Sequence, residues 1–485
     1  MNKNAARWIA LCTSCLFVHA VDAAAEEPSS CPASPCNGTI VAQSAPTSRG
    51  SLFEDEKPPA AEGEGSRSRE ELFGPSVAPG PGNAPAWHGF LRSKLAYTYA
   101  EPAHWSKLLL QGELDGQGAL SANVKYKIGA RLDYDFVYDA TDFYPPDVRR
   151  DQRVNVLLRE NYLDIGAGDW DFRLGRQHIV WGEMVGLFFA DVVSAKDLRE
   201  FILPDFDILR IPQWAARAEY FKNDFHAEAI WIPVPSYDEI GKPGAEFFPA
   251  VPPPPPGFAT SFSNEQFPRR TIAHTNYGLR LSVLRNGWDV SGFYYHSMDA
   301  QPTFYRQIEV GPQPAFVYQA RHDRIDQLGA TVAKDLGPAV FKLESVYTRG
   351  RSFNVLRADD DGVVPQNTLD IAAALDFSLP EDTRLNLQVF DRTFFDHDPD
   401  IVYKQHEPGM SVLLSRRFLD RLTAEVLYIT SLNRSDWMAR PRLIWDFQKN
   451  WQWIAGVDIF GGPALGFFGQ YDNRDRVYAE VRYAF

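Results

Sequence analysis

The last eleven residues of the chain, DRVYAEVRYAF at 475–485, alternate apolar and polar side chains and finish on an aromatic ring. Side chains of an extended strand point to opposite faces at every second residue. One face of this strand is apolar and consists of Val477, Ala479, Val481, Tyr483 and Phe485. The other face carries Tyr478, Glu480 and Arg482. A strand of this kind separates an apolar environment from a wet one.

The same alternation recurs along the chain from Trp87 onward. Residues 124–136 place apolar side chains at every second position and charged ones between them, over more than twice the usual length of a soluble strand. The pattern returns at 277–283, 369–379 and 437–447. Its length and repetition indicate tilted strands that cross a membrane.

The connections between these strands fall into two classes. Tight turns at 166–169, 222–224, 285–287, 336–338, 380–382 and 449–450 alternate with long segments at 138–151, 182–212, 234–272, 299–320, 350–366, 396–406 and 461–475. Outer-membrane barrels have short periplasmic turns, long extracellular loops and an even number of strands. We therefore predict an all-β protein, a single transmembrane antiparallel up-and-down β-barrel of about 18 strands, with 16 as the next alternative.

The beginning of the chain predicts export. Lys3 and Arg7 precede an apolar run, and small residues follow it, as in a cleaved signal peptide at 1–25. Residues 26–85 are rich in Pro, Gly, Ser and Glu, which predicts a disordered periplasmic arm before a barrel at 86–485. Cys31 and Cys36 of this arm are expected to form a disulfide in an oxidising compartment.

Composition narrows the function. The formal charge of −14 makes nucleic acid an unfavourable partner, because phosphate binding needs a basic surface. An outer-membrane hydrolase would need a nucleophile beside a base, yet the histidines are scattered and neither G-x-S-x-G nor H-E-x-x-H occurs. We expect no enzyme activity, no cofactor and no bound metal.

A distinctive segment, LGRQHIVWGE at 174–183, precedes a loop that contains KDLR at 196–199. It resembles a family of Gram-negative outer-membrane barrels known only as a domain of unknown function, in which Gly-Arg-Gln-x-x-x-Trp-Gly-Glu precedes Asn-Pro-x-Asp-Leu-Arg. Ser194-Ala195 stand here where that family has Asn-Pro. The resemblance covers about residues 87–485 and implies a transport role beside hydrophobe or lipid export systems.

The terminal aromatic strand also resembles the C-terminal recognition signal of Gram-negative outer-membrane barrels. This resemblance implies that Tyr483 and Phe485 are read by the barrel-assembly machinery. The protein is therefore expected in the outer membrane, in contact with lipid and lipopolysaccharide, with periplasmic or inner-membrane transport components as possible further partners.

The motif segment also carries structural predictions. Phe172 and Leu174 share a face with Ile179 and Trp181 only if a spare residue lies between them, which predicts a β-bulge at Gly175 that turns Arg176 and His178 inward. Trp181 is assigned to an aromatic girdle at the membrane surface. The following loop, 183–212, is too apolar for a solvated excursion, so it either folds into the barrel as a constriction or packs outside as a cap.

The alternation gives a set of candidate pore-lining or substrate-contacting residues. They are Arg131, Asp133, Arg173, Arg176, His178, Asp197, Arg199, Arg280, Arg392, Arg440 and Arg442. Their basic excess favours an anionic or amphiphilic cargo. The sequence thus predicts a channel or export conduit for a small, amphiphilic or hydrophobic substrate, with a non-conducting structural or adhesive barrel as the alternative.

Overall fold

The computed structural model describes residues 85–182, 184, 190–358 and 361–485. The predicted signal peptide, the predicted arm apart from Pro85, and the predicted Cys31–Cys36 disulfide lie outside these residues. The strands of the barrel begin at Ala86.

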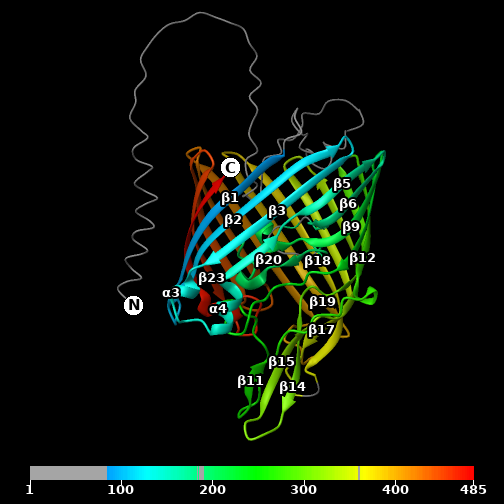
Figure 1. The fold of residues 1–485 in the computed structure, drawn as a ribbon. Coiled ribbons are helices and arrows are strands. Elements are labelled where there is room, and N and C mark those ends of the chain that lie inside the picture. The colour runs from blue at the N-terminus through cyan, green and yellow to red at the C-terminus, as the bar shows by residue number, and fades with distance from the viewer. Residues whose placement is uncertain (1–84, 183, 185–189, 359–360) are drawn as a thin grey trace, which may run out of the picture. The chain divides into compact units, whose positions relative to one another are not determined.

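The described residues form a closed antiparallel barrel of 18 strands, which confirms the predicted fold (Figure 1). Each strand pairs with the next one along the wall, and the last pairs with the first. Two short strands, β4 and β5, share one position of the wall, because both pair with β3. In order around the barrel the strands are β1 (Ala86–Thr98), β2 (His104–Ser121), β3 (Val124–Asp135), β4 (Val154–Leu158) with β5 (Asn161–Ala167), β6 (Trp170–Gln177), β9 (Gln213–Lys222), β10 (Phe225–Val234), β12 (Asn276–Arg285), β13 (Trp288–Met298), β16 (Arg324–Asp335), β17 (Ala339–Asn354), β18 (Val363–Leu379), β19 (Thr383–Phe395), β20 (His406–Phe418), β21 (Leu422–Ser431), β22 (Trp437–Gln448), β23 (Trp451–Gly461) and β24 (Arg476–Ala484).

The barrel closes where β24 pairs with β1 in continuous register, from Arg476 opposite Thr98 to Ala484 opposite Phe90. Just beyond the strand, Gly89 and Phe485 exchange both backbone hydrogen bonds, at 2.9 and 3.0 Å. A Cβ atom at Gly89 would collide with the carbonyl oxygen of Glu113 on β2, so only glycine fits at this seam. Closure leaves the sheet without a free edge.

Short turns occupy one end of the barrel, as predicted. All six predicted tight turns connect the expected strands, and further short turns join β2 to β3 and β20 to β21. Asn223, Asn286 and Asn450 adopt positive φ in these turns, a conformation that asparagine tolerates better than most residues. The amide of Ala484 donates to the carbonyl oxygen of Asn450, which places the last strand's end beside a short turn.

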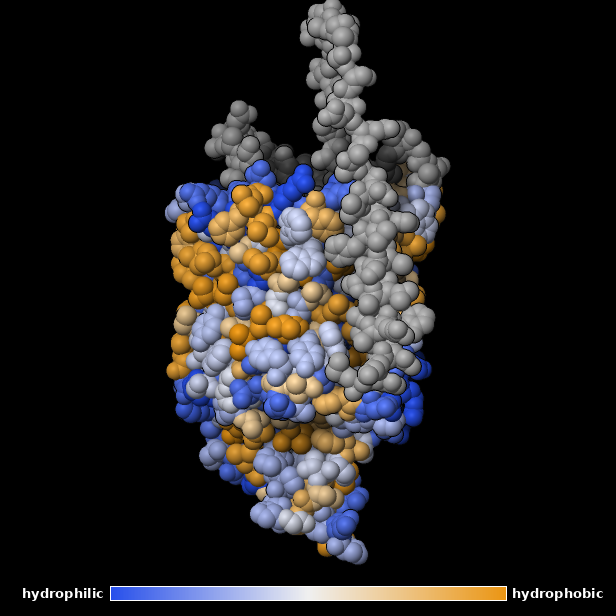
Figure 2. Space-filling view, turned by 90° about the vertical axis from the view of Figure 1, so that its left-hand side faces the viewer, coloured by the Kyte–Doolittle hydropathy of each residue, from blue (hydrophilic) through white to orange (hydrophobic). Residues whose placement is uncertain are grey.

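The outer surface of the wall is apolar. On β12, Tyr277, Leu279, Leu281 and Val283 are exposed, whereas Asn276 and Gly278, which alternate with them, are buried. Figure 2 shows hydrophobic residues gathered over the strands on one side of the barrel. Seven tryptophans point outward and are between 40 and 52% exposed: Trp87, Trp105, Trp170, Trp214, Trp231, Trp288 and Trp445. This is the outside of a barrel that faces lipid.

The long connections gather at the other end and contain more regular structure than the sequence predicted (Figure 1). Strand β15 pairs with β14 antiparallel and with β11 in parallel, and Phe304, Phe316 and Tyr318 of this small sheet pack in a cluster with Ile240. The parallel partner comes from a different loop, so no local pattern announces it. The elements of these connections are α3 (Val137–Ala140), α4 (Pro146–Gln152), β7 (Ala195–Lys196), η1 (Leu198–Glu200), α5 (Phe206–Leu209), β8 (Arg210–Ile211), β11 (Ala259–Phe262), η2 (Ile272–His274), β14 (Thr303–Glu309), β15 (Ala315–Arg321) and η3 (Gly469–Arg474). Within the described ranges, the helices are all too short or too polar to cross a membrane.

The seam generates a first prediction. Phe485→Ala should lower the amount of folded, heat-modifiable barrel, because the ring packs on Tyr483 with centroids 6.0 Å apart and covers Gly89. Folded barrel is measured by electrophoresis of unheated and heated outer-membrane samples. Phe418→Ala is the matched control, because Phe418 is also an outward-facing ring at a strand end. Equal losses in the two variants would contradict a special role for the seam.

Candidate functional site: a segment folded into the lumen

After β6 the chain enters the barrel instead of leaving it. Residues 178–212, here called the inward segment, are described apart from 183 and 185–189. Ile179, Trp181 and Val193 pack in one cluster with inward-facing residues of β9, β10, β13 and β17. Phe201 and Leu203 pack in another cluster with residues of β21, β22 and β23. The two clusters lie on parts of the wall that are several strands apart in both directions, so the segment crosses the lumen.

A buried carboxylate fixes the middle of the inward segment. Glu200 of η1 accepts from Lys94 Nζ of β1 at 3.0 Å, Lys107 Nζ of β2 at 3.2 Å and Arg476 Nη2 of β24 at 3.1 Å. All four side chains are at most 14% exposed. Strand alternation directs the three cations into the lumen from adjacent strands, where they converge on one acid.

A second anchor lies on β22. Arg442 Nη1 is 3.3 Å from Asp205 Oδ1 of the inward segment, and Arg440 Nη2 donates to the carbonyl oxygen of Leu203 at 2.7 Å. Both arginines also pair along the wall. Arg442 binds Glu425 of β21 at 2.7 Å, and Arg440 binds Asp458 of β23 at 2.9 Å.

A third anchor is formed with backbone atoms of the segment. Glu344 of β17, 1% exposed, accepts from the amides of Met184 and Ala190 at 2.9 Å each. On the far side, Arg131 Nη1 of β3 donates to the carbonyl oxygen of Ile208 at 3.1 Å. The wall therefore satisfies polar groups of the segment that would otherwise be buried without partners.

The segment is also tied to the loop that follows β10. Asp197 pairs with Arg199, which reaches Glu239 at 3.2 Å, and the amide of Lys196 donates to Asp238 Oδ1 at 2.8 Å. Burial raises the pKa of the Asp238 carboxyl to about 6, against the opposing effect of Lys196. Below that pH the group is neutral while an oxygen remains to accept the amide, so this attachment does not depend on charge alone.

The structure brings some of the predicted residues together at the inward segment and leaves others apart. Arg131, Asp133, Asp197 and Arg199 line one cavity beside the segment, and Arg440 and Arg442 line a second one. Three predicted residues are elsewhere on the wall, where Arg173 pairs with Asp164, Arg392 with Asp370, and Arg280 donates to Ser291. A substrate-contacting role for any of them stays a prediction.

The predicted β-bulge at Gly175 is wrong. Register runs without interruption through Gly175 on both of its neighbours, β5 and β9. The extra residue lies in the adjacent position of the wall. Ala130 of β3 pairs with Leu158 and Lys127 pairs with Tyr162, so the three residues 159–161 face only residues 128 and 129. Gly175 has φ +132°, and a Cβ there would collide with the backbone of Asn161.

The bulge at residues 159–161 explains why the chain turns inward at His178. Glu160, at the bulge, accepts from Lys127 Nζ at 2.6 Å and from the amide of His178 at 3.3 Å, which directs the chain inward after β6. Arg176 is half-buried at the end of β6 and pairs in register with Trp214 of β9.

The predicted position of Trp181 in an aromatic girdle is also wrong. The residue is 1% exposed and packs inside the barrel on Phe293 and Tyr295, so it does not belong to a girdle at the lipid surface. The wall cations that bind Glu200 are functional candidates that the sequence did not predict. Lys94 and Lys107 follow the period-two pattern of their strands, which was available as a signal, but which acid they meet depends on the path of the inward segment.

Known proteins resemble this chain in sequence profile and in fold. The profile of the family described as "Protein of unknown function (DUF1302)" matches residues 106–386. The chain belongs to this family. No curated protein sequence matches this chain.

Solved structures of several bacterial proteins are similar to this chain over most of its length. OccAB3 of Acinetobacter baumannii has TM-score 0.49 and 10% identity, over 83% of this chain and 99% of that one. OccK8 (OprE) of Pseudomonas aeruginosa has TM-score 0.49 and 10% identity, over 83% and 98%. OmpF of Salmonella typhi, in a complex with daunomycin, has TM-score 0.43 and 8% identity, over 83% and 98%.

The Glu200 anchor yields a second prediction. Glu200→Gln should lower the free energy of opening of the inward segment by about 3–5 kcal/mol, because three buried cations lose the counter-charge that they share. Lys107 and Arg476 each keep a second acid on the wall, Asp135 and Asp458. Faster hydrogen exchange in peptides from residues 190–212 of the folded barrel measures this. Glu381→Gln is the control, since its pair with Arg416 is exposed and worth at most about 1 kcal/mol. Unchanged exchange in Glu200→Gln would show that the apolar clusters hold the segment alone.

Proposed function

We propose that the chain is an outer-membrane channel in which the inward segment is a displaceable gate, and that its cargo is an anionic amphiphile. The observation that carries the proposal is the composition of the gate at its main anchor. Glu200 meets three cations of the wall, and the next residue, Phe201, enters an apolar cluster with Met438 and Phe460. The gate thus occupies a wall site that has a basic part and an apolar part side by side.

A cargo with an acidic group and an apolar body offers that wall the same contacts. Its anionic group would replace Glu200 at Lys94, Lys107 and Arg476, and its apolar part would replace Phe201. Exchange of this kind costs little, because buried cations are costly only when they are left unpaired. A neutral polar solute would gain no such compensation for displacing the gate.

The wider setting of this function is also a proposal. We propose export through a cleaved signal peptide and recognition of Tyr483 and Phe485 by the barrel-assembly machinery. We also propose that outer-membrane lipid and lipopolysaccharide surround the wall. The apolar exterior and the closed seam support these proposals. Partnership with periplasmic or inner-membrane transport components rests on the transport role that the family resemblance implies.

One observation favours a second candidate, the non-conducting structural barrel. The charged residues that line the lumen around the inward segment pair with one another, as Asp458 does with both Arg440 and Arg476 at 2.9 Å. A lumen filled in this way needs no transport role to explain its charges. Conductance separates the two candidates.

The test is the removal of the gate. Replacing residues 178–212 by a short Gly/Ser connection between the paired residues Gln177 and Gln213 should give a folded barrel with a several-fold larger single-channel conductance in a planar bilayer. The control replaces residues 303–321, the β14–β15 hairpin at the loop end, and should conduct like the unaltered protein. A shortened barrel that folds and still does not conduct would favour the structural candidate.

Charge selectivity gives a further prediction. In the barrel without the gate, Arg440→Gln with Arg442→Gln should shift the reversal potential in a salt gradient toward cations, because their partners Asp458 and Glu425 remain. The control, Arg416→Gln, changes an exposed arginine at the short-turn end. A reversal potential that does not move would place the selective part of the pore elsewhere.

A further inference from the structure

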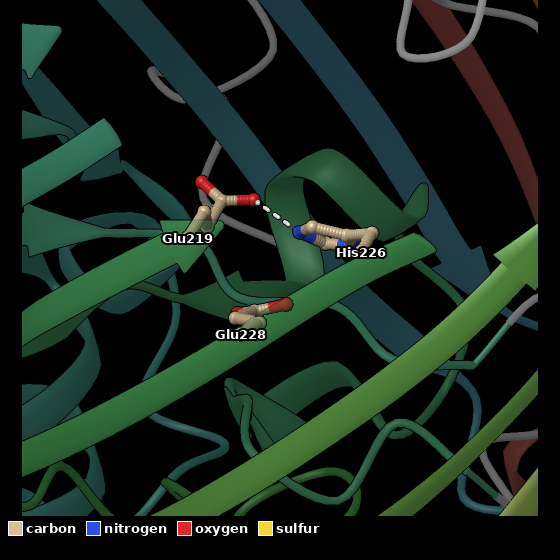
Figure 3. A group of neighbouring side chains, drawn as sticks. All are labelled: Glu219, His226 and Glu228. Atoms are coloured by element: carbon tan, nitrogen blue, oxygen red, sulfur yellow. Dashed lines mark hydrogen bonds and ion pairs between the residues drawn. The ribbon is translucent and has the colours of Figure 1, made fainter. Parts of the chain in front are cut away.

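The β9–β10 hairpin presents three metal-ligating side chains to the lumen. Glu219 of β9 and His226 and Glu228 of β10 each offer a ligand atom, and these atoms lie within 4.8 Å of one another. Figure 3 shows the Glu219 carboxylate turned toward the ring of His226, with Glu228 beside them on β10. The tight turn at Asn223 creates this proximity, because it sets Glu219 directly opposite Glu228 and leaves His226 two residues away on the same face.

The cluster belongs to a row of acidic residues across three strands. Asp171 of β6 is directly opposite Glu219, and Glu219 is directly opposite Glu228. Like charges in such positions repel each other. Arg217 binds Glu219 at 2.5 Å, and Arg280 is opposite Glu228 in register while its Nε donates to Ser291.

One oxygen of the cluster lacks the partner that burial demands. Glu228 is 4% exposed, the indole N–H of Trp181 interacts with its carboxylate, and its Oε1 has no partner in good hydrogen-bond geometry among the described residues. A buried carboxylate oxygen without a partner is costly, and a bound cation would supply the missing contact. This orphaned atom is independent of the spacing that defines the cluster.

The histidine is oriented for coordination. His226 Nδ1 lies 3.2 Å from Ser282 Oγ of β12, and Nε2 lies 3.2 Å from Glu219 Oε1. With Nδ1 protonated and donating to Ser282, the Nε2 lone pair faces the two carboxylates, the usual arrangement of a metal-binding imidazole. Phe221 stacks on the ring, with centroids 4.5 Å apart and planes at 10°, and holds it in place.

We propose that Glu219, His226 and Glu228 bind one divalent transition-metal ion, of which Zn²⁺ is the best match, on the lumen wall near the short-turn end. One imidazole nitrogen with two carboxylate oxygens suits Zn²⁺, whereas Ca²⁺ and Mg²⁺ prefer oxygen ligands throughout. The ion would relieve the repulsion between Glu219 and Glu228 and give Glu228 Oε1 its partner. Three protein ligands leave a coordination position for water or for an anionic group in the lumen.

The site is tested by titrating the purified, tag-free full-length barrel with Zn²⁺ and following binding by calorimetry. His226→Gln and Glu228→Gln should each weaken binding by about tenfold or more. The matched control is His296→Gln, which alters another histidine that pairs with a carboxylate, Asp326, at 2.6 Å. Zinc bound elsewhere on the protein is common to all variants and cancels in the comparison.

A second measurement shows whether the ion is coordinated directly. Co²⁺ added to the protein should produce visible absorption bands of a protein-bound ion, and the bands should be lost in His226→Gln and kept in His296→Gln. Electrophoretic heat modifiability shows that each variant is folded. Zinc affinity and Co²⁺ bands that are the same in folded His226→Gln and Glu228→Gln as in the unaltered chain would overturn the proposal.

Discussion

The ion pairs of Glu200 are the constraint on which the interior of this barrel depends. A carboxylate and three cations removed from water cost several kcal/mol per ion, and only close mutual contact compensates for that cost. The three cations come from β24, β1 and β2, the strands at and beside the seam where the barrel closes. Closure of the wall and seating of the inward segment are therefore linked, because the cations converge only after β24 has paired with β1.

Much of the fold could be predicted from the sequence because a barrel wall is governed by local rules. Lipid outside and charge inside force a period of two, as at Tyr277–Val283, and tight turns need residues that tolerate positive φ, such as Asn286. Both signals are contained in a few consecutive residues. The barrel, its 18 strands and its tight turns follow from them.

The site could be predicted only in part because it is made of contacts between distant segments. The apolar residues of the inward segment required cover, but the sequence alone left an external cap as an equal alternative. The alternation around Gly175 predicts the bulge in that strand, whereas the extra residue lies at Glu160 in the neighbouring position of the wall. An aromatic residue after a strand is typical of a girdle and so predicts Trp181 at the lipid surface, whereas its burial depends on partners from β13.

The cluster at Glu219, His226 and Glu228 likewise could not be recognised from the sequence alone. Its residues are only nine apart, yet no single strand shows them as a group, because register across the turn brings Glu219 and Glu228 together. Asp171 is distant in sequence and joins the row only through the pairing of β6 with β9.

In the proposed channel, gating and charge selectivity would be linked. The acids of the inward segment neutralise wall cations, since Glu200 binds Lys94, Lys107 and Arg476, and Asp205 binds Arg442. If the segment moves away, its acids leave with it and the cations of the wall stay. The open lumen is then more basic than the closed one, so the act of opening itself attracts anions. An anion that enters stabilises the open state by replacing the lost counter-charge, and its departure favours return of the segment. Under the proposed function, the cargo that pairs best with the wall would also be the one that opens it.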